Sequence, residues 1–456
     1  MAYLFNTPQD CEQMLQAIGV GSIEELFASV SKDLRLQRPL DIPDALTEIE
    51  LTRKMMALAA RNSGVSSSVC FLGGGAYDHF IPAVVDAIAS RGEFFTSYTP
   101  YQPEVSQGNL QVMFEYETLI CELTGMDVSN ASLYDGASAT IEAVLLALAA
   151  QAGRRKVVVP DTLHPEYRQV LATYLQWTDA ELVTVPCPDG TLPIDAWRSE
   201  LDETVACVVL SQPNFFGVVE DLQVASEIAK SAGVVVVAVV DMISLGILAC
   251  PKAWGADIVV GEGQSLGNPL QYGGPYLGIM ACREPFVRRM PGRIAGQTED
   301  RHGNRCWVLT LQTREQHIRR DKATSNICTN QGLFALRAAI YLSLLGPAGM
   351  RETAEQCAWK GQFLRESLIE STRFEVRFEG ATWREFVIRD RAGNVAGLIT
   401  HAAEQGMLAG LPLATWYPDL GDCLLVAVTE KRTRSEIEQL VNVLETAPET
   451  SELTHA

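Results

Sequence analysis

Six short apolar segments, separated by helical or turn-like sequence, constrain most strongly how this chain can fold. They are rich in Val and Ile and apolar throughout: Lys156–Pro160, Glu181–Pro186, Ala206–Ser211, Val234–Met242, Ala256–Gly261 and Tyr276–Cys282. Strands of this kind are covered on both faces, as in a parallel sheet. Helical patterns at Glu166–Gln176 and Leu222–Ala232 provide the crossovers that such a sheet requires. The sequence therefore predicts an α/β fold with a mainly parallel, seven-stranded-type sheet, whose last strand could pair antiparallel.

The regions on either side of these segments have different patterns. Residues 1–65 place apolar side chains at helical intervals, over Asp10–Ile18, Ile23–Val30 and Leu46–Ala60. After Gly332 two long helices, Leu333–Leu345 and Gly349–Ser371, precede a smaller α/β set with strands at Phe374–Phe378, Arg384–Arg389 and Cys423–Thr429. We expect a helical arm at 1–65, a large domain at 66–330 and a small C-terminal α/β domain at 331–456, which the length of 456 residues allows.

Composition and charge exclude several classes of function. A formal net charge of -20 would repel a nucleic-acid backbone. The eleven cysteines are dispersed without a C-x-x-C pair, and the six histidines form no metal-binding pattern, so we expect reduced thiols and no metal. The N-terminus does not resemble a signal peptide and no uninterrupted apolar run is long enough to cross a bilayer. These features predict a cytoplasmic protein that acts without a membrane.

A first candidate site follows the turn that opens a helix near residue 136. Asp135, Ser138 and Thr140 lie where backbone N–H groups and hydroxyls would converge at the positive end of the helix dipole. This arrangement could hold an anion. It could equally be a helix cap with small residues for close packing.

Two further residues lie at the edge of the predicted sheet where α/β proteins bind ligands. Asp241 ends the most apolar strand, and a carboxylate at this point pairs with the pyridine nitrogen in pyridoxal-phosphate enzymes. It could instead cap the next turn. His164 precedes Pro165 at a helix start, where its ring could stack on a planar cofactor or simply cap its own helix.

The segment Gly255–Pro275 contains no lysine at the place where such enzymes carry one. A strand runs here into a Gly- and Pro-rich loop, but Schiff-base chemistry requires a primary amine. The nearest lysine, Lys252, lies before the strand, at the wrong end for the site. The sequence therefore predicts that this chain binds no pyridoxal phosphate covalently.

Six long motifs resemble the N-terminal half of the glycine decarboxylase P-protein, which many bacteria make as a separate alpha subunit. They cover nearly the whole chain in the right order: Phe71–Pro82, Ser97–Gln111, Leu133–Ala143, Leu163–Leu171, residues 255–275 and Arg314–Leu333. The resemblance implies a fold-type I, aspartate aminotransferase-like architecture. It also implies a beta subunit that holds pyridoxal phosphate on its own lysine, in a heterodimer or heterotetramer.

The activity implied by the resemblance is that of glycine dehydrogenase (aminomethyl-transferring), an oxidoreductase. Glycine loses carbon dioxide, and its aminomethyl group passes to the lipoyl group of the H-protein. Two alternatives remain open. The chain could be a complete decarboxylase or lyase that uses an unrecognised lysine, such as Lys252 or Lys322, or it could be a scaffolding pseudoenzyme.

The resemblance also assigns candidate roles to residues. By the resemblance, the missing lysine falls at about Gln264 or Ser265. The same comparison implies that these two positions belong to a relic of a cofactor site together with Asp135, Ser138, Thr140, His164 and Asp241. The residues proposed to line the partner's active site are Tyr98, Thr99, Pro100, Tyr101, Gln102, Glu104 and Gln107. These loop residues could instead only pack the subunit interface.

A charged run, Arg314–Lys322, contains the last candidates. The resemblance places Arg319, Arg320 and Lys322 near the active-site cleft, where cations could steer the acidic H-protein or the glycine carboxylate. On composition alone the run would be a solvated helix face.

Overall fold

The structure, a computed structural model, describes residues 5–449 and divides the chain into two compact units, Met1–Ser63 and Gly64–Ala456. The first unit contains α1 (Pro8–Ile18) and α2 (Glu48–Ala59), as predicted, and each begins with a capping box. The expected helix at Ile23–Val30 is wrong, because only a 3₁₀ turn forms at Glu24–Phe27. A segment this short, with no buried side chain, cannot offset the cost of helix nucleation.

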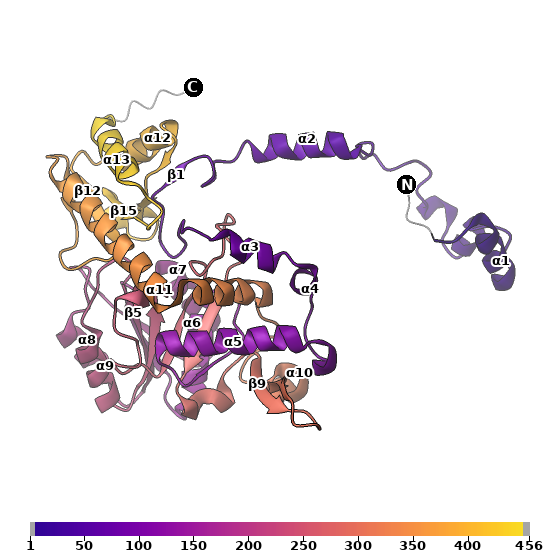
Figure 1. The fold of residues 1–456 in the computed structure, drawn as a ribbon, viewed down its shortest axis with the longest axis horizontal. Coiled ribbons are helices and arrows are strands. Elements are labelled where there is room, and N and C mark those ends of the chain that lie inside the picture. Colours follow the sequence, from indigo (N-terminus) through magenta and orange to yellow (C-terminus); the bar gives the residue numbers. More distant parts are fainter. Residues whose placement is uncertain (1–4, 450–456) are drawn as a thin grey trace. The chain divides into compact units, whose positions relative to one another are not determined.

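A seven-stranded sheet forms the centre of the second unit (Figure 1). Its order is β2 (Val128–Ser129), β8 (Gly278–Cys282), β7 (Ile258–Glu262), β6 (Val235–Val240), β5 (Val205–Gln212), β3 (Lys156–Pro160) and β4 (Glu181–Val185). The strands from β7 to β4 pair in parallel, whereas β8 is antiparallel to both neighbours. All six predicted strands are confirmed, and the two-residue β2 was missed.

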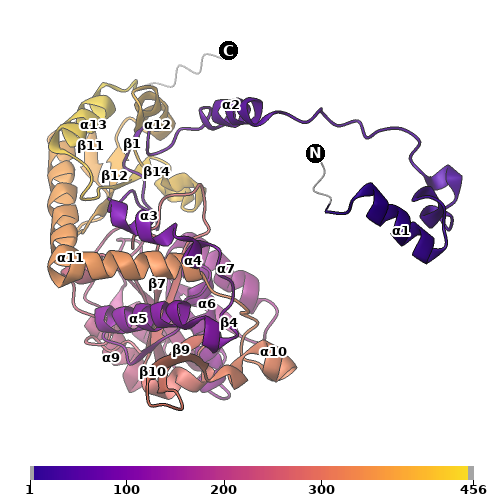
Figure 2. The same cartoon turned by 45° about the vertical axis from the view of Figure 1, so that its right-hand side comes forward.

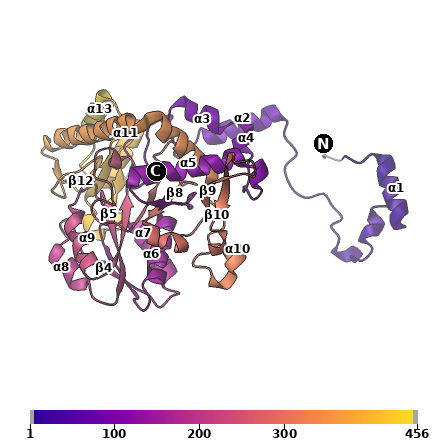
Figure 3. The ribbon, with the colours of Figure 1, turned by 60° about the horizontal axis from the view of Figure 1, so that its bottom comes forward.

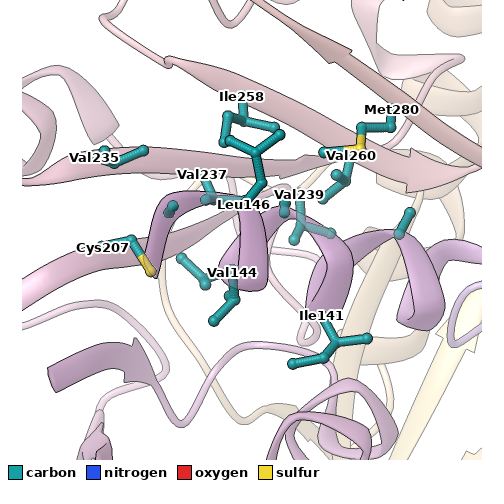
Figure 4. Close-up of a cluster of buried hydrophobic side chains, with 14 of the residues drawn as sticks. Ile141, Val144, Leu146, Cys207, Val235, Val237, Val239, Ile258, Val260 and Met280 are labelled. Carbon is teal, nitrogen blue, oxygen red and sulfur yellow. The ribbon is translucent and has the colours of Figure 1, made fainter. Parts of the chain in front are cut away.

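Helices cover both faces of this sheet, which explains why its strands are apolar throughout. On one face, α6 (Gly136–Ala150) packs on alternate strand residues such as Val237 and Val260 (Figure 4), and α7 (Pro165–Leu175) packs on α6 and β4. On the other face, α5 (Gln107–Thr124) and α11 (Gly332–Ile369) pack on Ala238 and Val259. Towards β4, α8 (Ile194–Glu200) and α9 (Leu222–Ser231) cover the strands (Figure 3). The short helix α3 (Ala83–Ala89) packs on α11, α4 (Gly92–Phe95) follows α3, and α10 (Gln316–Arg319) lies after the last strand of the large-domain region.

A four-stranded antiparallel sheet follows in the C-terminal part. Its order is β11 (Phe374–Val376), β12 (Glu385–Asp390), β15 (Cys423–Ala427) and β14 (Leu411–Pro412), and α12 (Val395–Glu404) and α13 (Arg434–Thr446) pack on it. Two small pairings were not predicted: β1 (Val69–Cys70) with β13 (Met407–Leu408), and the hairpin of β9 (Ile294–Glu299) with β10 (Arg305–Thr310). The four-stranded sheet lies within the same compact unit as the seven-stranded sheet.

The helix α11 runs from one sheet to the other (Figure 2). It joins the two long helices expected from the sequence, with non-helical backbone at Gly346 followed by Pro347. By length and composition alone it could cross a membrane, but core helices of soluble proteins pass the same test. Its residues Ala335, Ala338 and Tyr341 are buried in the core against α5 and the sheet.

Candidate functional site

A cavity of about 80 Å³ lies at the carboxyl ends of β5, β6 and β7, where α/β proteins bind ligands. Its walls come from both sheets: Asp241 and Glu262 from the large one, and Arg384 and Glu385 from the small one. Three of the seven residues expected in a relic cofactor site, His164, Asp241 and Ser265, line this cavity. Its polar groups, however, are engaged with one another.

Asp241 makes an ion pair with Arg384 inside this cavity. The other oxygen of Asp241 accepts hydrogen bonds from the backbone N–H groups of Ile243 at 2.9 Å and Ser244 at 3.2 Å, so the residue also caps the turn after β6. The Arg384 side chain is only 1% exposed, and its guanidinium lies 3.2 Å from the centre of the Tyr77 ring. The Arg384 guanidinium thus takes the place beside Asp241 that the pyridine nitrogen of a cofactor would need.

The start of α6 is likewise occupied by a side chain of the protein. The carboxyl group of Glu262 accepts hydrogen bonds from the N–H groups of Gly136 at 3.0 Å and of Gln264 and Leu277 at 2.9 Å each. Burial raises the pKa of Glu262 to about 8, although these N–H donors oppose the shift. Glu262 therefore fills the end of α6 at which an external anion would bind.

Of the predicted residues around this helix start, Asp135 caps the helix and Thr140 bonds back to the first turn. Asp135 accepts a hydrogen bond from the Ser138 N–H at 2.7 Å, and the Thr140 hydroxyl donates to the carbonyl of Gly136 at 2.8 Å. An added Cβ at Gly136 would lie 2.0 Å from the hydroxyl of Tyr167 and 3.0 Å from the backbone nitrogen of Glu262, so a side chain here would have to displace Tyr167. The close approach of Tyr167 further fills the space beside the helix.

His164 stacks on Tyr167, with ring centres 4.7 Å apart. Its Nε2 lies 2.7 Å from the carbonyl oxygen of Gly74, and its Nδ1 accepts from the Glu166 N–H at 3.2 Å. Burial lowers the pKa of His164, which favours the neutral ring with its proton on Nε2. Both alternatives for this residue are therefore partly realised: it caps α7 and it stacks, but on a protein side chain.

The position of the missing lysine is occupied by two buried neutral residues. Gln264 accepts a hydrogen bond from the Tyr77 N–H at 2.8 Å and donates to the carbonyls of Tyr77 at 3.1 Å and Asn268 at 2.8 Å. Ser265 lines the cavity, and no lysine is present among the residues described as lining it. Lys252 instead pairs with Asp127.

These residues do not fit a pyridoxal phosphate. The amine is absent from the described cavity wall, Asp241 is paired with Arg384, and the N–H group of Gly136 at the start of α6 is bonded to Glu262. The sequence reading missed Glu262, Tyr167 and Arg384. Glu262 stands within the segment that lacks the lysine, but Arg384 is distant in sequence and only the fold brings it to Asp241.

The loop predicted to face a partner forms one wall of a second cavity of about 250 Å³. Tyr98, Thr99 and Pro100 line it, and the Tyr98 side chain is 84% exposed. Tyr101, Gln102 and Glu104 are also exposed. Gln107 has a structural role, because its amide exchanges hydrogen bonds with the backbone of Trp307 at 2.9 Å in both directions. This loop is therefore held by the β9–β10 hairpin and presents aromatic side chains to solvent.

The predicted steering cations lie on the surface. Arg319, Arg320 and Lys322 are exposed, and within residues 5–449 none of them has an ion-pair partner. They occupy a four-residue helix and a 3₁₀ turn, with Arg320 in the left-handed region at φ 55°. They are therefore free to meet an acidic surface.

One buried group of residues has the composition of a metal site. Ligand atoms of His79, Cys357 and Glu430 lie within 4.8 Å of one another. However, His79 Nδ1 lies 2.6 Å from Glu430, and its Nε2 contacts the Arg384 guanidinium. The imidazole is thus already bonded on both sides, and the adjacent cation would repel a metal ion.

Comparison with known proteins finds relatives that belong to one family. The family described as glycine cleavage system P-protein matches residues 1–444. A probable glycine dehydrogenase (decarboxylating) subunit 1 of Desulforamulus reducens is 49% identical over 96% of this chain and 98% of the relative. The protein of the same name from Carboxydothermus hydrogenoformans is 47% identical over 97% of this chain and 99% of the relative.

Solved structures agree with these matches. A crystal structure of glycine decarboxylase (P-protein) of the glycine cleavage system, in inhibitor-bound form, has a TM-score of 0.88 and 42% identity, and the match covers 98% of this chain and 99% of that one. A Lactobacillus brevis glutamate decarboxylase, at 13% identity, has a TM-score of 0.68 over 92% of this chain and 96% of that one, which shows the fold alone. The expected fold-type I architecture is confirmed.

Proposed function

Because this chain belongs to the glycine cleavage system P-protein family, we propose that it is the cofactor-free subunit 1 of glycine dehydrogenase (decarboxylating). A second subunit then carries the pyridoxal phosphate. The observation that carries this proposal is the occupied cavity. Glu262 is bonded to the start of α6, where the cofactor phosphate would bind, and Arg384 is paired with Asp241, the carboxylate that the cofactor would need free. Ser265 lines the cavity where the cofactor would need an amine. The alternative of a self-sufficient enzyme is not favoured, because neither Lys252, which pairs with Asp127, nor Lys322, which is exposed on the surface, is among the residues described as lining the cavity.

The need for a partner is supported by the surface of the N-terminal unit. None of the described residues 5–63 is buried, and many large apolar side chains are exposed, such as Ile49 at 60% and Met56 at 67%. Exposed apolar surface of this extent indicates a protein interface. The name subunit 1 of the relatives implies a second subunit, so we propose that it covers this surface in a heterodimer or heterotetramer.

In the proposed complex, this chain supplies walls of the partner's active site. Tyr98, Thr99 and Glu104 stand on the exposed loop before α5, where hydroxyl and carboxylate groups can orient a small zwitterion such as glycine and exclude water. The partner's pyridoxal phosphate supplies the electron sink when glycine loses carbon dioxide. The aminomethyl group then passes to one sulfur of the lipoyl disulfide of the H-protein, and the other sulfur is released as a thiol.

The surface charge suits an encounter with a carrier protein. Arg319, Arg320 and Lys322 are exposed cations without described ion pairs in a chain whose formal net charge is -20. We propose that they steer the acidic H-protein or glycine towards the shared site. The eleven free cysteines agree with a reducing, cytoplasmic location for the complex.

The test is to reconstitute the pair and assign the cofactor. The chain, its partner and the mixture are each incubated with pyridoxal phosphate, reduced with borohydride and mapped by mass spectrometry. We expect one stoichiometric adduct, on the partner, and glycine–bicarbonate exchange only in the mixture. A stoichiometric adduct on a lysine of this chain, or exchange by this chain alone, would contradict the proposal.

A further inference from the structure

The cavity beside the partner-facing loop contains a single charged residue. Its walls are aromatic or apolar side chains, including Phe94, Met113 and Leu333, with a few amides and hydroxyls between them. Arg293 is the only ionisable cation among its described lining residues, and none of these is acidic. In a chain with 56 acidic and 36 basic residues, this combination is unexpected and needs a physical explanation.

Arg293 is buried without a carboxylate partner. The residue is 3% exposed. Its Nη1 donates to the Asn330 side-chain oxygen at 3.1 Å, and its Nη2 donates to the carbonyl of Cys328 at 2.9 Å. Within residues 5–449 no ion pair involves Arg293, and its Nε has no described acceptor. Burying a guanidinium among neutral acceptors is costly, because neutral oxygens do not replace the hydration of the charge.

The side chain of Tyr101 contacts the Arg293 guanidinium. Its ring centre is 5.6 Å from the guanidinium carbon, and its hydroxyl accepts from Nη2 at a long 3.5 Å. Tyr101 is 57% exposed, so the buried cation contacts a side chain that itself meets solvent. The long contact is weak enough to be exchanged for a stronger acceptor.

We propose that this cavity binds a small-molecule carboxylate and that Arg293 is the residue that pairs with it. The planar fork of a guanidinium matches the two oxygens of a carboxylate, and the side-chain amide of Asn109 adds a donor at the same cavity. The identity of the ligand rests on the proposed function: the carboxylate is that of glycine as it enters the shared active site. Tyr98, Thr99 and Pro100, proposed to line that site, form one wall of the same cavity.

The proposed contact predicts a specific kinetic effect. The carboxylate loses its charge when carbon dioxide leaves, so Arg293 stabilises bound glycine and does not stabilise the transition state. In the reconstituted pair, R293M should raise the KM for glycine by about 10- to 100-fold, with kcat unchanged or higher. R293K, which keeps the charge but not the fork, should raise it less.

Inhibition by the two halves of glycine tests carboxylate recognition directly. Acetate should compete with glycine in the wild-type pair and lose most of its inhibition in R293M, whereas inhibition by methylamine should persist. The matched control is R305M, which removes one positive charge from an arginine that stacks on Trp307 and does not line the cavity. Circular dichroism and thermal melting check that each variant is folded.

The outcomes separate this inference from the proposed function. No exchange by the wild-type pair would contradict the proposed function itself. Wild-type exchange with an unchanged KM and unchanged acetate inhibition in both folded R293M and R293K would overturn the role of Arg293. Weakened subunit association with an unchanged KM would also overturn it, since a carboxylate of the partner would then be the ligand.

Discussion

The carboxylate of Asp241 and the guanidinium of Arg384 form a buried ion pair that joins the two sheets of the second unit. Asp241 follows β6 in the large sheet, and Arg384 precedes β12 in the small one. The network continues from Arg384 to His79 and from His79 to Glu430, which lies beyond β15. A carboxylate suited to a cofactor thus serves here as an internal brace.

Removing one partner of this brace should destabilise the chain strongly. We expect R384M to lower the free energy of unfolding by about 3–5 kcal/mol, because it leaves the Asp241 carboxylate partly buried without its cation. The double variant D241N/R384M should lose less than the sum of the single losses. Urea unfolding of the isolated chain measures both.

A surface arginine provides the control for this series. Arg389 is 35% exposed and pairs with Glu375 at 3.2 Å and Asp422 at 2.9 Å. R389M should therefore cost no more than about 1 kcal/mol. If R384M proved no more costly than R389M, the ion pair would not brace the two sheets.

Restoring the missing lysine should not by itself restore cofactor binding. Ser265 lines the cavity, but in S265K the side chains of Glu262 and Arg384 would still occupy the positions at α6 and at Asp241. We therefore expect no stoichiometric borohydride-reducible adduct on S265K in the presence of pyridoxal phosphate. A reduced adduct mapped to residue 265 would show that the occupying side chains yield easily.

Sequence patterns predicted the parts of the fold that depend on local periodicity. The six strands of the large sheet were visible because segments such as Val234–Met242 are apolar on both faces, and the break between the two long C-terminal helices was visible at Gly346 and Pro347. The β9–β10 hairpin and the two-residue strands were missed because their residues are partly exposed or too few for a period to show.

The sequence predicted where the site lies but not which side chains occupy it. Asp241, His164 and the start of α6 could be placed at one sheet edge because chain order and strand direction determine that edge. That Arg384 would occupy it could not be predicted, since 143 residues separate it from Asp241 and no local pattern connects them. The sequence also could not predict that Arg293 is buried without a carboxylate partner, because only the packed structure determines which charges lie next to each other.

The apolar surface of α2 should matter for association and not for folding of the chain. In I49E/M56E two apolar residues become acidic, and neither side chain is buried within the first unit. We expect an unchanged melting temperature for the isolated chain and at least a tenfold weaker binding of the second subunit, measured by sedimentation or calorimetry. A matched pair of polar changes, E48Q/K54Q on the same helix, should leave binding within about threefold.

The buried carboxyl group of Glu262 should make the stability of the chain fall as the pH rises. Its pKa is raised from 4.5 to about 8, chiefly by burial, so between these values the unfolded chain has lost a proton that the folded chain still holds. In that interval this one group should lower the free energy of unfolding by up to about 1.4 kcal/mol per pH unit.

The variant E262Q isolates this contribution, because an amide has no proton to lose. Both proteins are unfolded in urea at pH 5, 6, 7, 8 and 9, and the difference between wild type and E262Q is compared across the series. We expect wild type to lose stability relative to E262Q from pH 5 to 8 and the difference to level off above that. The absolute cost of E262Q is not decisive, since the amide also changes the hydrogen bonds from Gly136, Gln264 and Leu277. Parallel pH curves would mean that Glu262 is ionised in the folded chain, held as an anion by the start of α6.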